Sequence, residues 1–227
     1  TDFRKENGVW KIAYRRIFTE FEAPYQGGWA SLTPKRPSDW QSDVGERFPP
    51  DEPPTEMYAP FPDVFVPPFH YEPGEIGRTA VLQTASSDAG GEIGALEAAA
   101  DQVAARIAIA ASERAIENLQ GAYGYYVDRK MWDDVADLFA EGGTFETGQR
   151  GVYRGRDHIR AALEDLWGPQ DLQDGQMNDH LVLQPVIHVA ADGTTAMGRF
   201  RHIGMLGEYQ DWGRWEDGIY ENAFVKE

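Results

Sequence analysis

Residues 115–139, AIENLQGAYGYYVDRKMWDDVADLF, contain the pattern that decides the predicted fold. Apolar side chains recur at three- and four-residue steps from Ile93 through Tyr123, which is the spacing of one face of a helix. A long helix is therefore predicted from about Ile93, and a second, shorter helix from Trp132 to Phe139. The segment thus predicts two consecutive helices joined by a short turn.

Strands are predicted on the C-terminal side of these helices. Gly142-Gly143 is expected to end the second helix, and residues 144–147 are expected to begin a strand. Asp157 is a candidate N-cap for a third helix over about residues 158–167. Three more strands are expected, over residues 180–189, 194–206 and 219–226. Helices followed by a meander of strands predict an α+β domain, with the helices packed on one face of a curved sheet.

The N-terminal part of the chain has a different composition. Eleven of the 14 prolines fall between Pro34 and Pro73. Proline cannot donate the backbone hydrogen bond that helices and central strands need, so this stretch is predicted to be an extended strap. Interleaved aromatic residues indicate that the strap packs on a surface, and a free tether is the alternative. We divide the chain into a β-hairpin (1–33), the strap (34–87) and a C-terminal domain (88–227).

The two ends of the chain resemble each other. Phe224-Val225-Lys226-Glu227 matches Phe3-Arg4-Lys5-Glu6, and the N-terminal copy continues through an Asn7-Gly8 turn signal into residues 9–18. The C-terminal domain thus lacks a closing strand of the type that the N-terminus holds. Three explanations are open: a piece of a tandem-domain protein, a circular permutant whose hairpin docks on its own sheet, or a hairpin exchanged between two copies. The deciding question is whether residues 9–18 pair with the last predicted strand.

Composition and charge exclude several classes of function. The 227 residues carry a formal net charge of −17, which opposes binding to nucleic acid and to anionic membrane surfaces. The sequence contains no cysteine, which excludes disulfides, thiolate metal sites and a cysteine nucleophile. No apolar run is long enough to span a membrane, and no signal peptide is recognised. A cytoplasmic location is favoured, and a periplasmic one stays open if an N-terminal segment was removed.

Several segments carry a resemblance to a known superfamily. They are residues 115–119, 125–128, 132–139 and 151–159, with His180 at the start of a strand and residues 7–14. Over residues 93–227 and 3–25 the chain resembles the SnoaL-like, nuclear transport factor 2-like superfamily. The resemblance implies an α+β fold shaped as a cone, with three helices packed in a strongly curved mixed β-sheet. It also implies that no metal or organic cofactor is needed, and that the chain forms a homodimer or a higher homo-oligomer.

The resemblance also implies candidate catalytic residues. In dehydratase-like members, an aspartate four residues before a tryptophan orients a catalytic histidine, and these two residues are Asp128 and His180 here. The tyrosine that precedes the aspartate in the family is Val127 in this sequence, so Tyr126 is the candidate substitute. A neutral histidine that faces a carboxylate can take a proton from a bound substrate. Asp128 and His180 are therefore predicted to form a proton-transfer dyad.

Further residues are expected to polarise the substrate and to line the pocket. The second catalytic histidine of the family aligns with Phe200, whereas His202 lies two residues later on the same face of the strand. We expect His202, Tyr126 or Tyr220 to polarise the substrate oxygen. The predicted substrate-binding residues are Tyr123, Trp132, Phe145, Met205, Trp215 and Tyr220. The five histidines show no metal-ligand spacing, so no metal site is expected.

These expectations lead to one function and one alternative. The chain is predicted to be a cofactor-independent lyase or isomerase that moves protons on a small hydrophobic aromatic substrate, such as a lignin-derived or polyketide-like compound. The alternative is a non-catalytic small-molecule-binding or assembly domain of the same fold. The enzyme predicts a cavity of roughly several hundred Å³ with the dyad on its wall. The alternative predicts a filled cone, or an aspartate and a histidine too far apart to interact.

Overall fold

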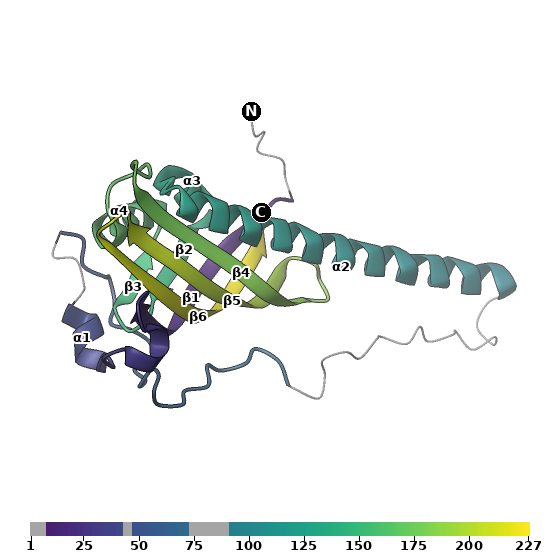
Figure 1. Cartoon of the computed structure of the whole chain (residues 1–227). Coiled ribbons are helices and arrows are strands. Elements are labelled where there is room, and N and C mark those ends of the chain that lie inside the picture. Colours follow the sequence, from purple (N-terminus) through teal and green to yellow (C-terminus); the bar gives the residue numbers. More distant parts are fainter. Residues whose placement is uncertain (1–7, 43–46, 73–90) are drawn as a thin grey trace.

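The computed structural model describes residues 8–42, 47–72 and 91–227, which form one mixed sheet covered by helices. The strands lie in the order β3-β2-β1-β6-β5-β4 (Figure 1). Their bounds are Trp10–Pro24 (β1), Phe139–Thr147 (β2), Gly151–Arg154 (β3), Gln176–Val189 (β4), Thr195–Glu208 (β5) and Trp212–Lys226 (β6). Neighbouring strands are antiparallel, except that β1 and β2 are parallel. Along β5, buried residues alternate with more exposed ones, as expected for a strand with one face on the core.

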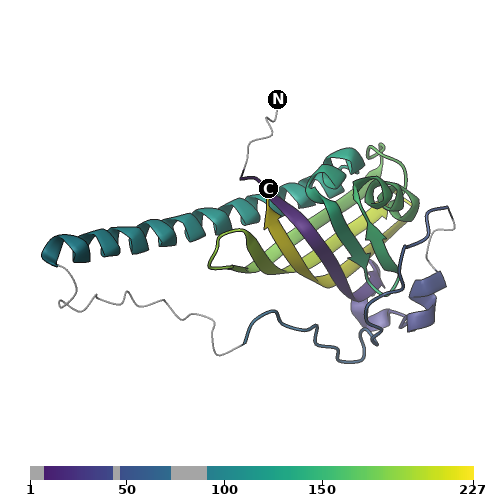
Figure 2. The same cartoon turned by 180° about the vertical axis from the view of Figure 1, so that it is seen from behind.

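Three helices pack against this sheet. Their bounds are Gly91–Asp128 (α2), Trp132–Asp137 (α3) and Arg156–Trp167 (α4), and two short helices lie nearer the N-terminus, η1 at Gly28–Ser31 and α1 at Pro37–Ser42. The C-terminal part of α2 contacts β4 and β1, whereas α4 contacts β2 and β3. Seen from behind, α3 and α4 lie together at one end of the sheet, opposite the free end of α2 (Figure 2). The predicted α+β architecture, with helices packed on one mixed sheet, is confirmed.

Two predicted helix boundaries are wrong. α3 ends at Asp137 and β2 begins at Phe139, so Gly142-Gly143 lies inside a strand and does not end the helix. The N-cap of α4 is Gly155, without a capping side chain, and Asp157 lies in the first turn. There its negative charge still interacts favourably with the positive end of the helix dipole.

Strand β1 completes the sheet of its own chain. It runs antiparallel to β6, with Trp10 opposite Lys226 and Phe18 opposite Ile219. On its other side it runs parallel to β2. The N-terminal segment therefore pairs with the last strand, which answers the question of connectivity for a single chain.

Only one half of the predicted N-terminal hairpin lies within the described residues. The segment 3–6 is outside them, and the rest forms one continuous strand that reaches Pro24. A β-bulge interrupts the register of this strand between Ile12 and Tyr14. A bulge changes which side chains face the core on its two sides. Exchange of this strand between two copies stays a prediction, and so do the proposed domain boundaries.

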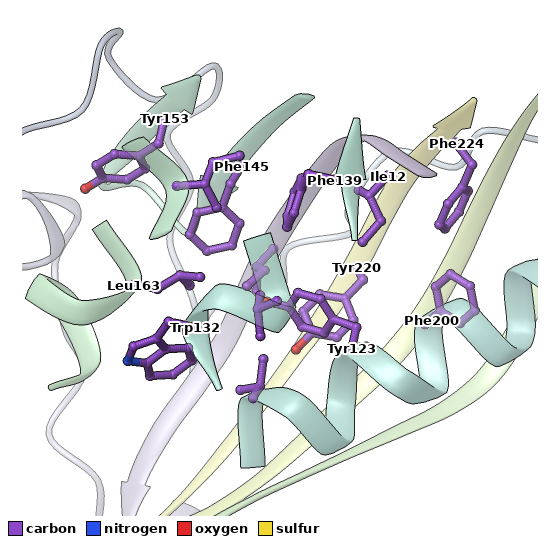
Figure 3. Close-up of a cluster of buried hydrophobic side chains, with 14 of the residues drawn as sticks. Ile12, Tyr123, Trp132, Phe139, Phe145, Tyr153, Leu163, Phe200, Tyr220 and Phe224 are labelled. Atoms are coloured by element: carbon purple, nitrogen blue, oxygen red, sulfur yellow. The ribbon is translucent and has the colours of Figure 1, made fainter. Parts of the chain in front are cut away.

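Large aromatic side chains fill the space between the helices and the inner face of the sheet (Figure 3). The cluster includes Ile12, Tyr123, Trp132, Phe139, Phe145, Tyr153, Leu163, Phe200, Tyr220 and Phe224. The indole N–H of Trp132 donates to the carbonyl of Gly168 at 2.9 Å, which ties α3 to the end of α4. Burying one such side chain stabilises the fold by about 1.5–3 kcal/mol. The same rings leave little free volume inside the cone.

Residues 47–72 of the strap pack on the outer face of the sheet, whereas Pro37–Ser42 form the short helix α1, so that part of the strap is not extended as predicted. The rings of Tyr58 and Phe65 stack with their centroids 4.2 Å apart, and both contact Phe18 of β1. Glu146 of β2, which is buried, accepts a hydrogen bond from the backbone N–H of Thr55 at 2.8 Å. These residues therefore form a packed strap and not a free tether.

The first half of α2 extends beyond the sheet (Figures 1 and 2). Four of its large apolar side chains are exposed: Ile93, Leu96, Val103 and Ile107. The C-terminal half of the same helix buries Ile116 and Tyr123 in the core. The periodicity thus predicts the helix correctly, although only half of its apolar face has a partner in the described residues. No described helix, α2 included, combines the length and the apolar character needed to cross a membrane.

Candidate active site

The end of α2 brings Asp128 against His180 near the start of β4. Oδ1 of Asp128 accepts a hydrogen bond from the backbone N–H of His180 at 2.7 Å and lies 3.3 Å from Nδ1 of the same residue. The side chains of Asp128 and His180 are only 15% and 11% exposed. A carboxylate only accepts hydrogen bonds, so it favours the proton on Nδ1 and leaves Nε2 as the basic nitrogen. The predicted pair is therefore close enough to act as a dyad.

Rings from three strands stack next to the dyad. His180 stacks on His202 of β5 with a centroid distance of 5.1 Å, and His202 stacks on Tyr220 of β6 at 5.3 Å. Burial, with smaller effects from His180 and the Arg15 charge, lowers the pKa of His202 well below its usual value. His202 is therefore neutral near pH 7, and its Nε2 has no hydrogen-bond partner within the described part of the chain. This nitrogen is free to interact with a ligand.

Two tyrosines next to this stack hold a buried cation between them. The guanidinium carbon of Arg15 lies 3.4 Å from the ring centroid of Tyr123 and 3.8 Å from that of Tyr220. Burial raises the pKa of both tyrosines, and Arg15 opposes this rise. Both hydroxyls therefore stay protonated at neutral pH and can serve as hydrogen-bond donors.

The rings enclose an inner cavity of about 40 Å³. Its wall includes Tyr123, Asn178, His180, His202, Glu216 and Tyr220. This volume holds a few water molecules, whereas an apolar cavity that binds benzene measures about 150 Å³. The inner cavity is therefore much smaller than the predicted several hundred Å³, because aromatic side chains of the core occupy the inside of the cone. A space of the predicted size, with Asp128 and His180 on its wall, lies next to it.

A larger groove of about 410 Å³ lies between α2 and β4. Asp128 and His180 are both on its wall, together with Tyr125, Leu181 and Met205. His180 lines the groove and also the inner cavity, so it stands between the two spaces. A molecule held in the groove would meet the dyad directly.

The remaining predicted site residues are divided between the cavity and other places. Tyr123, Trp132 and Tyr220 line the inner cavity, as predicted. His202 does so as well and lies on the same strand face as Phe200, which is buried in the core. Their roles in binding or catalysis stay predictions.

Four predicted residues lie away from the inner cavity. Phe145 is part of the core and lines neither space. Met205 and Trp215 face each other on β5 and β6, and strand alternation points both away from the His202 face, so Met205 lines only the groove. Tyr126 is half-buried and packs against the core without reaching either space.

Three side chains at the cavity could also meet at a metal ion. His180, His202 and Glu216 come from three strands and place one possible ligand atom each within 4.8 Å of one another. The spacing of these residues in the sequence does not reveal the group. However, Glu216 already pairs with Arg214 at 2.5 Å, and the Arg15 cation beside His202 opposes a divalent ion. These charges favour proton chemistry over metal binding for the cluster.

A buried polar group formed by Arg15, Gln120 and Asn222 is not among the residues predicted from the sequence. Nη1 of Arg15 donates to Oε1 of Gln120 at 3.3 Å, and the Asn222 amide donates to the same oxygen at 2.9 Å. All three residues are buried. Asn222 lies two residues after Tyr220 on β6, so strand alternation could have placed it on the same face.

Comparison with known proteins identifies the family of the chain. The model of the SnoaL-like domain family matches residues 108–227, more than half of the chain. Among solved structures, the chain is similar to a candidate scytalone dehydratase from Novosphingobium aromaticivorans, with 22% identity over 50% of this chain and 73% of that one and a TM-score of 0.43. It is also similar to ActVI-ORFA from Streptomyces coelicolor, with 14% identity over 49% of this chain and 88% of that one and a TM-score of 0.41.

A third similar structure is a protein from Novosphingobium aromaticivorans described as NTF2-like with a cystatin-like fold. It shares 18% identity over 57% of this chain and 79% of that one, with a TM-score of 0.38. The comparison with curated proteins gives no match. The family model alone covers enough of the sequence to decide membership, and by that match the chain belongs to the SnoaL-like domain family.

Proposed function

We propose that this domain is a cofactor-independent, dehydratase-like lyase or an isomerase that transfers protons on a small hydrophobic aromatic substrate. The observation that carries the proposal is the contact between Asp128 and His180 at the boundary of the groove and the inner cavity. Membership in the SnoaL-like family supports a ligand site on this face of the sheet. The proton transfers proposed for Asp128 and His180 require no oxidant or reductant.

In the proposed reaction, His180 acts as the general base. Its Nε2 removes a proton from a carbon next to a carbonyl group of the substrate, and Asp128 stabilises the imidazolium that results. The electron pair left on that carbon forms a double bond. In a dehydration, the neighbouring hydroxyl leaves and takes the proton from His180 as water. In an isomerisation, the proton returns to a different carbon.

Hydrogen-bond donors at the cavity stabilise the charge that develops on the substrate oxygen. Tyr220 stays protonated because burial raises its pKa, and His202 offers a neutral ring beside it. Donors that are already in place stabilise a developing oxyanion without reorganisation, and removing one typically costs about 10²–10³ in rate. Tyr220 and His202 are therefore the residues proposed to polarise the substrate.

The proposal is tested with a His180→Gln variant and a panel of hydroxylated aromatic ketones. Turnover is followed by mass spectrometry as loss of water, and proton abstraction as uptake of deuterium from the solvent. We expect both rates to fall about 10²–10⁴-fold, the usual contribution of a general base. His158→Gln on α4, which replaces a histidine paired with Asp51, is the matched control. Unchanged rates in His180→Gln would overturn the proposal.

One observation favours the alternative of a non-catalytic binding or assembly domain. The inner cavity of about 40 Å³ is much smaller than the cavity expected for an enzyme that encloses an aromatic substrate. The two functions differ in a measurable way. A binding domain would be stabilised by ligands to the same extent in the wild type and in His180→Gln, without exchanging any ligand proton for deuterium.

A further inference from the structure

Arg15 is a buried cation that has no carboxylate partner among the described residues. Its side chain has no exposed surface, and Nη1 donates to the neutral amide of Gln120. Nε and Nη2 have no hydrogen-bond partner in the described part of the chain. A buried charge is strongly unfavourable unless an opposite charge compensates it. The protein therefore keeps an unbalanced positive charge beside its candidate site.

The neighbours of Arg15 compensate its charge only in part. The faces of Tyr123 and Tyr220 attract the guanidinium as aromatic rings attract cations, but neither ring carries a charge. The positive charge reaches the cavity wall, since it opposes the pKa rise of both tyrosines and helps to lower the pKa of His202. All three of these residues line the inner cavity. The cavity is thus lined by groups that feel the Arg15 charge.

Two carboxylates at the cavity wall already pair with cations other than Arg15. Glu216 pairs with Arg214 at 2.5 Å, and Glu22 pairs with Lys35 at 2.9 Å. Both are therefore engaged with other cations. No carboxylate among the described residues therefore forms an ion pair with Arg15.

We propose that Arg15 selects ligands that carry an anionic oxygen, such as a carboxylate, a phenolate or an enolate. The oxygen enters the inner cavity, which has room for a group of a few atoms, and it accepts hydrogen bonds from the hydroxyls of Tyr123 and Tyr220. This inference rests on the proposed function for the position of the ligand, and it narrows the substrate class to aromatic anions. Arg15 touches no reacting atom and acts through the two tyrosines as a positioning residue.

Arg15→Met and Arg16→Met form a matched pair of variants for the test. Both replace an arginine of β1 with an apolar side chain of similar length. Arg16 lies on the outer face of the sheet and pairs with Glu56 at 3.3 Å and with Glu146 at 3.4 Å. Arg16→Met should therefore lower the Tm. Arg15→Met should keep or raise the Tm, because it removes an unpaired buried charge. A purely structural role for Arg15 predicts the opposite result.

Ligand preference is measured with benzoate and benzamide, which differ in charge and hardly in shape. Dissociation constants are obtained by isothermal titration calorimetry. The wild type and Arg16→Met should bind benzoate at least about tenfold more tightly than benzamide, as expected for one nearby charge in a buried site. Arg15→Met should lose that preference. Equal binding of the two probes by the wild type, or no binding of benzoate, would overturn the proposal.

A second measurement needs only the wild type and so does not depend on the folding of a variant. 4-Nitrophenol absorbs differently when it is ionised, and it should bind as the phenolate at a pH where it is mostly neutral in solution.

Asp128→Asn separates this inference from the proposed function. Loss of turnover with the anion preference intact supports both proposals. An anion preference without turnover in the wild type would reject only the enzyme.

Discussion

His180 lies directly opposite Gly204 in the β4–β5 ladder, and Gly204 in turn lies opposite Glu216 of β6. Directly opposed residues point to the same face of a sheet, so a side chain at position 204 would stand between His180 and Glu216. A Cβ there would come within 3.3 Å of Nε2 of His202 and 3.2 Å of Cβ of Glu216. A methyl group at this position would therefore press against two residues of the cavity wall, His202 and Glu216.

Gly204→Ala is expected to displace these two side chains of the cavity wall. The added methyl group would lie closer to its neighbours than ordinary van der Waals contact. The free energy of unfolding should therefore fall by about 1–3 kcal/mol, as for other overpacked cores. Binding of aromatic anions should weaken at the same time. Urea unfolding and calorimetry measure the two effects.

Gly142→Ala on β2 is the matched control for this change, since a Cβ at that position meets nothing within 4 Å. Its stability and its binding should stay close to those of the wild type. If Gly204→Ala bound ligands as well as Gly142→Ala does, the part of the cavity wall formed by His202 and Glu216 would play no part in binding.

Asp128→Asn should lower turnover by at least about tenfold, because the neutral amide cannot stabilise the imidazolium that His180 forms. The amide oxygen can still accept the hydrogen bond from the backbone N–H of His180, so the Tm should change little. A fall in kcat with a nearly constant KM is the expected signature. Asp137→Asn, which alters an exposed carboxylate 4.0 Å from Arg156 and away from both the groove and the inner cavity, is the control and should keep full activity.

Local patterns account for what could be predicted from the sequence. The three- and four-residue spacing predicts α2, and its end at Asp128 follows from the break before Trp132. Strand alternation places Phe200 and His202 on one face, and both are buried there. The contact between Asp128 and His180 follows from the resemblance to the family, because the two residues are far apart in the sequence.

Arg15 could not be predicted because a bulge changes the alternation of β1. Trp10 and Ile12 face the core, so strict alternation would place Tyr14 and Arg16 inside and Arg15 outside. The bulge between Ile12 and Tyr14 reverses this order. Nothing in the local composition marks the position of the extra residue. The buried cation is therefore visible only once the strands are paired.

The volume of the cavity could not be predicted for a different reason. A high aromatic content is compatible with both a pocket wall and a dense core. Phe145 belongs to the core and Trp215 to the outer face, where its ring stacks on Tyr25 at 6.0 Å. Whether an aromatic residue lines a pocket or fills the core depends on packing between segments that are distant in the sequence.

The stability of the protein should fall as the pH drops below about 6.5, partly because of His202. Burial lowers the pKa of His202 in the folded state, whereas the unfolded value is about 6.5. Between the folded and the unfolded pKa of His202, the unfolded state binds one more proton than the folded state. The contribution of His202 to the free energy of unfolding is therefore complete above about pH 6.5 and is lost on acidification. In His202→Gln, the free energy of unfolding measured with urea should depend less steeply on pH between about pH 5 and pH 7. An unchanged slope would mean that other groups control the acid sensitivity.

Asp217→Asn should stabilise the protein at pH 7 and above. Burial, with Glu20 nearby, raises the pKa of Asp217 to about 6, although Arg201 opposes the shift. The folded state therefore loses stability as the pH rises from about 4 to 6, and the loss is complete above that range. Because the side chain stays partly exposed, we expect a gain of about 1 kcal/mol after screening.

The gain from Asp217→Asn should be much smaller at about pH 4, where the folded carboxyl is protonated and the unfolded one is already about half protonated. Arg201 keeps a partner in the variant, since it also contacts Glu20 at 3.1 Å. Thermal unfolding at about pH 4 and pH 7.5 gives the comparison. A variant less stable than the wild type at pH 7.5 would show that the pair with Arg201 outweighs the cost of burial.

His70 anchors the strap to the sheet, and His70→Ala should release that end of the strap without unfolding the cone. Nδ1 of His70 lies 2.9 Å from Oε2 of Glu221, and Nε2 lies 3.0 Å from Nδ1 of His188. Glu221 keeps Arg199 as a partner in the variant, so the loss of stability should be only about 1 kcal/mol. Limited chymotrypsin digestion should cut the strap faster in His70→Ala than in His188→Ala, which loses one exposed contact. Equal cleavage rates would mean that aromatic packing, and not His70, holds the strap in place.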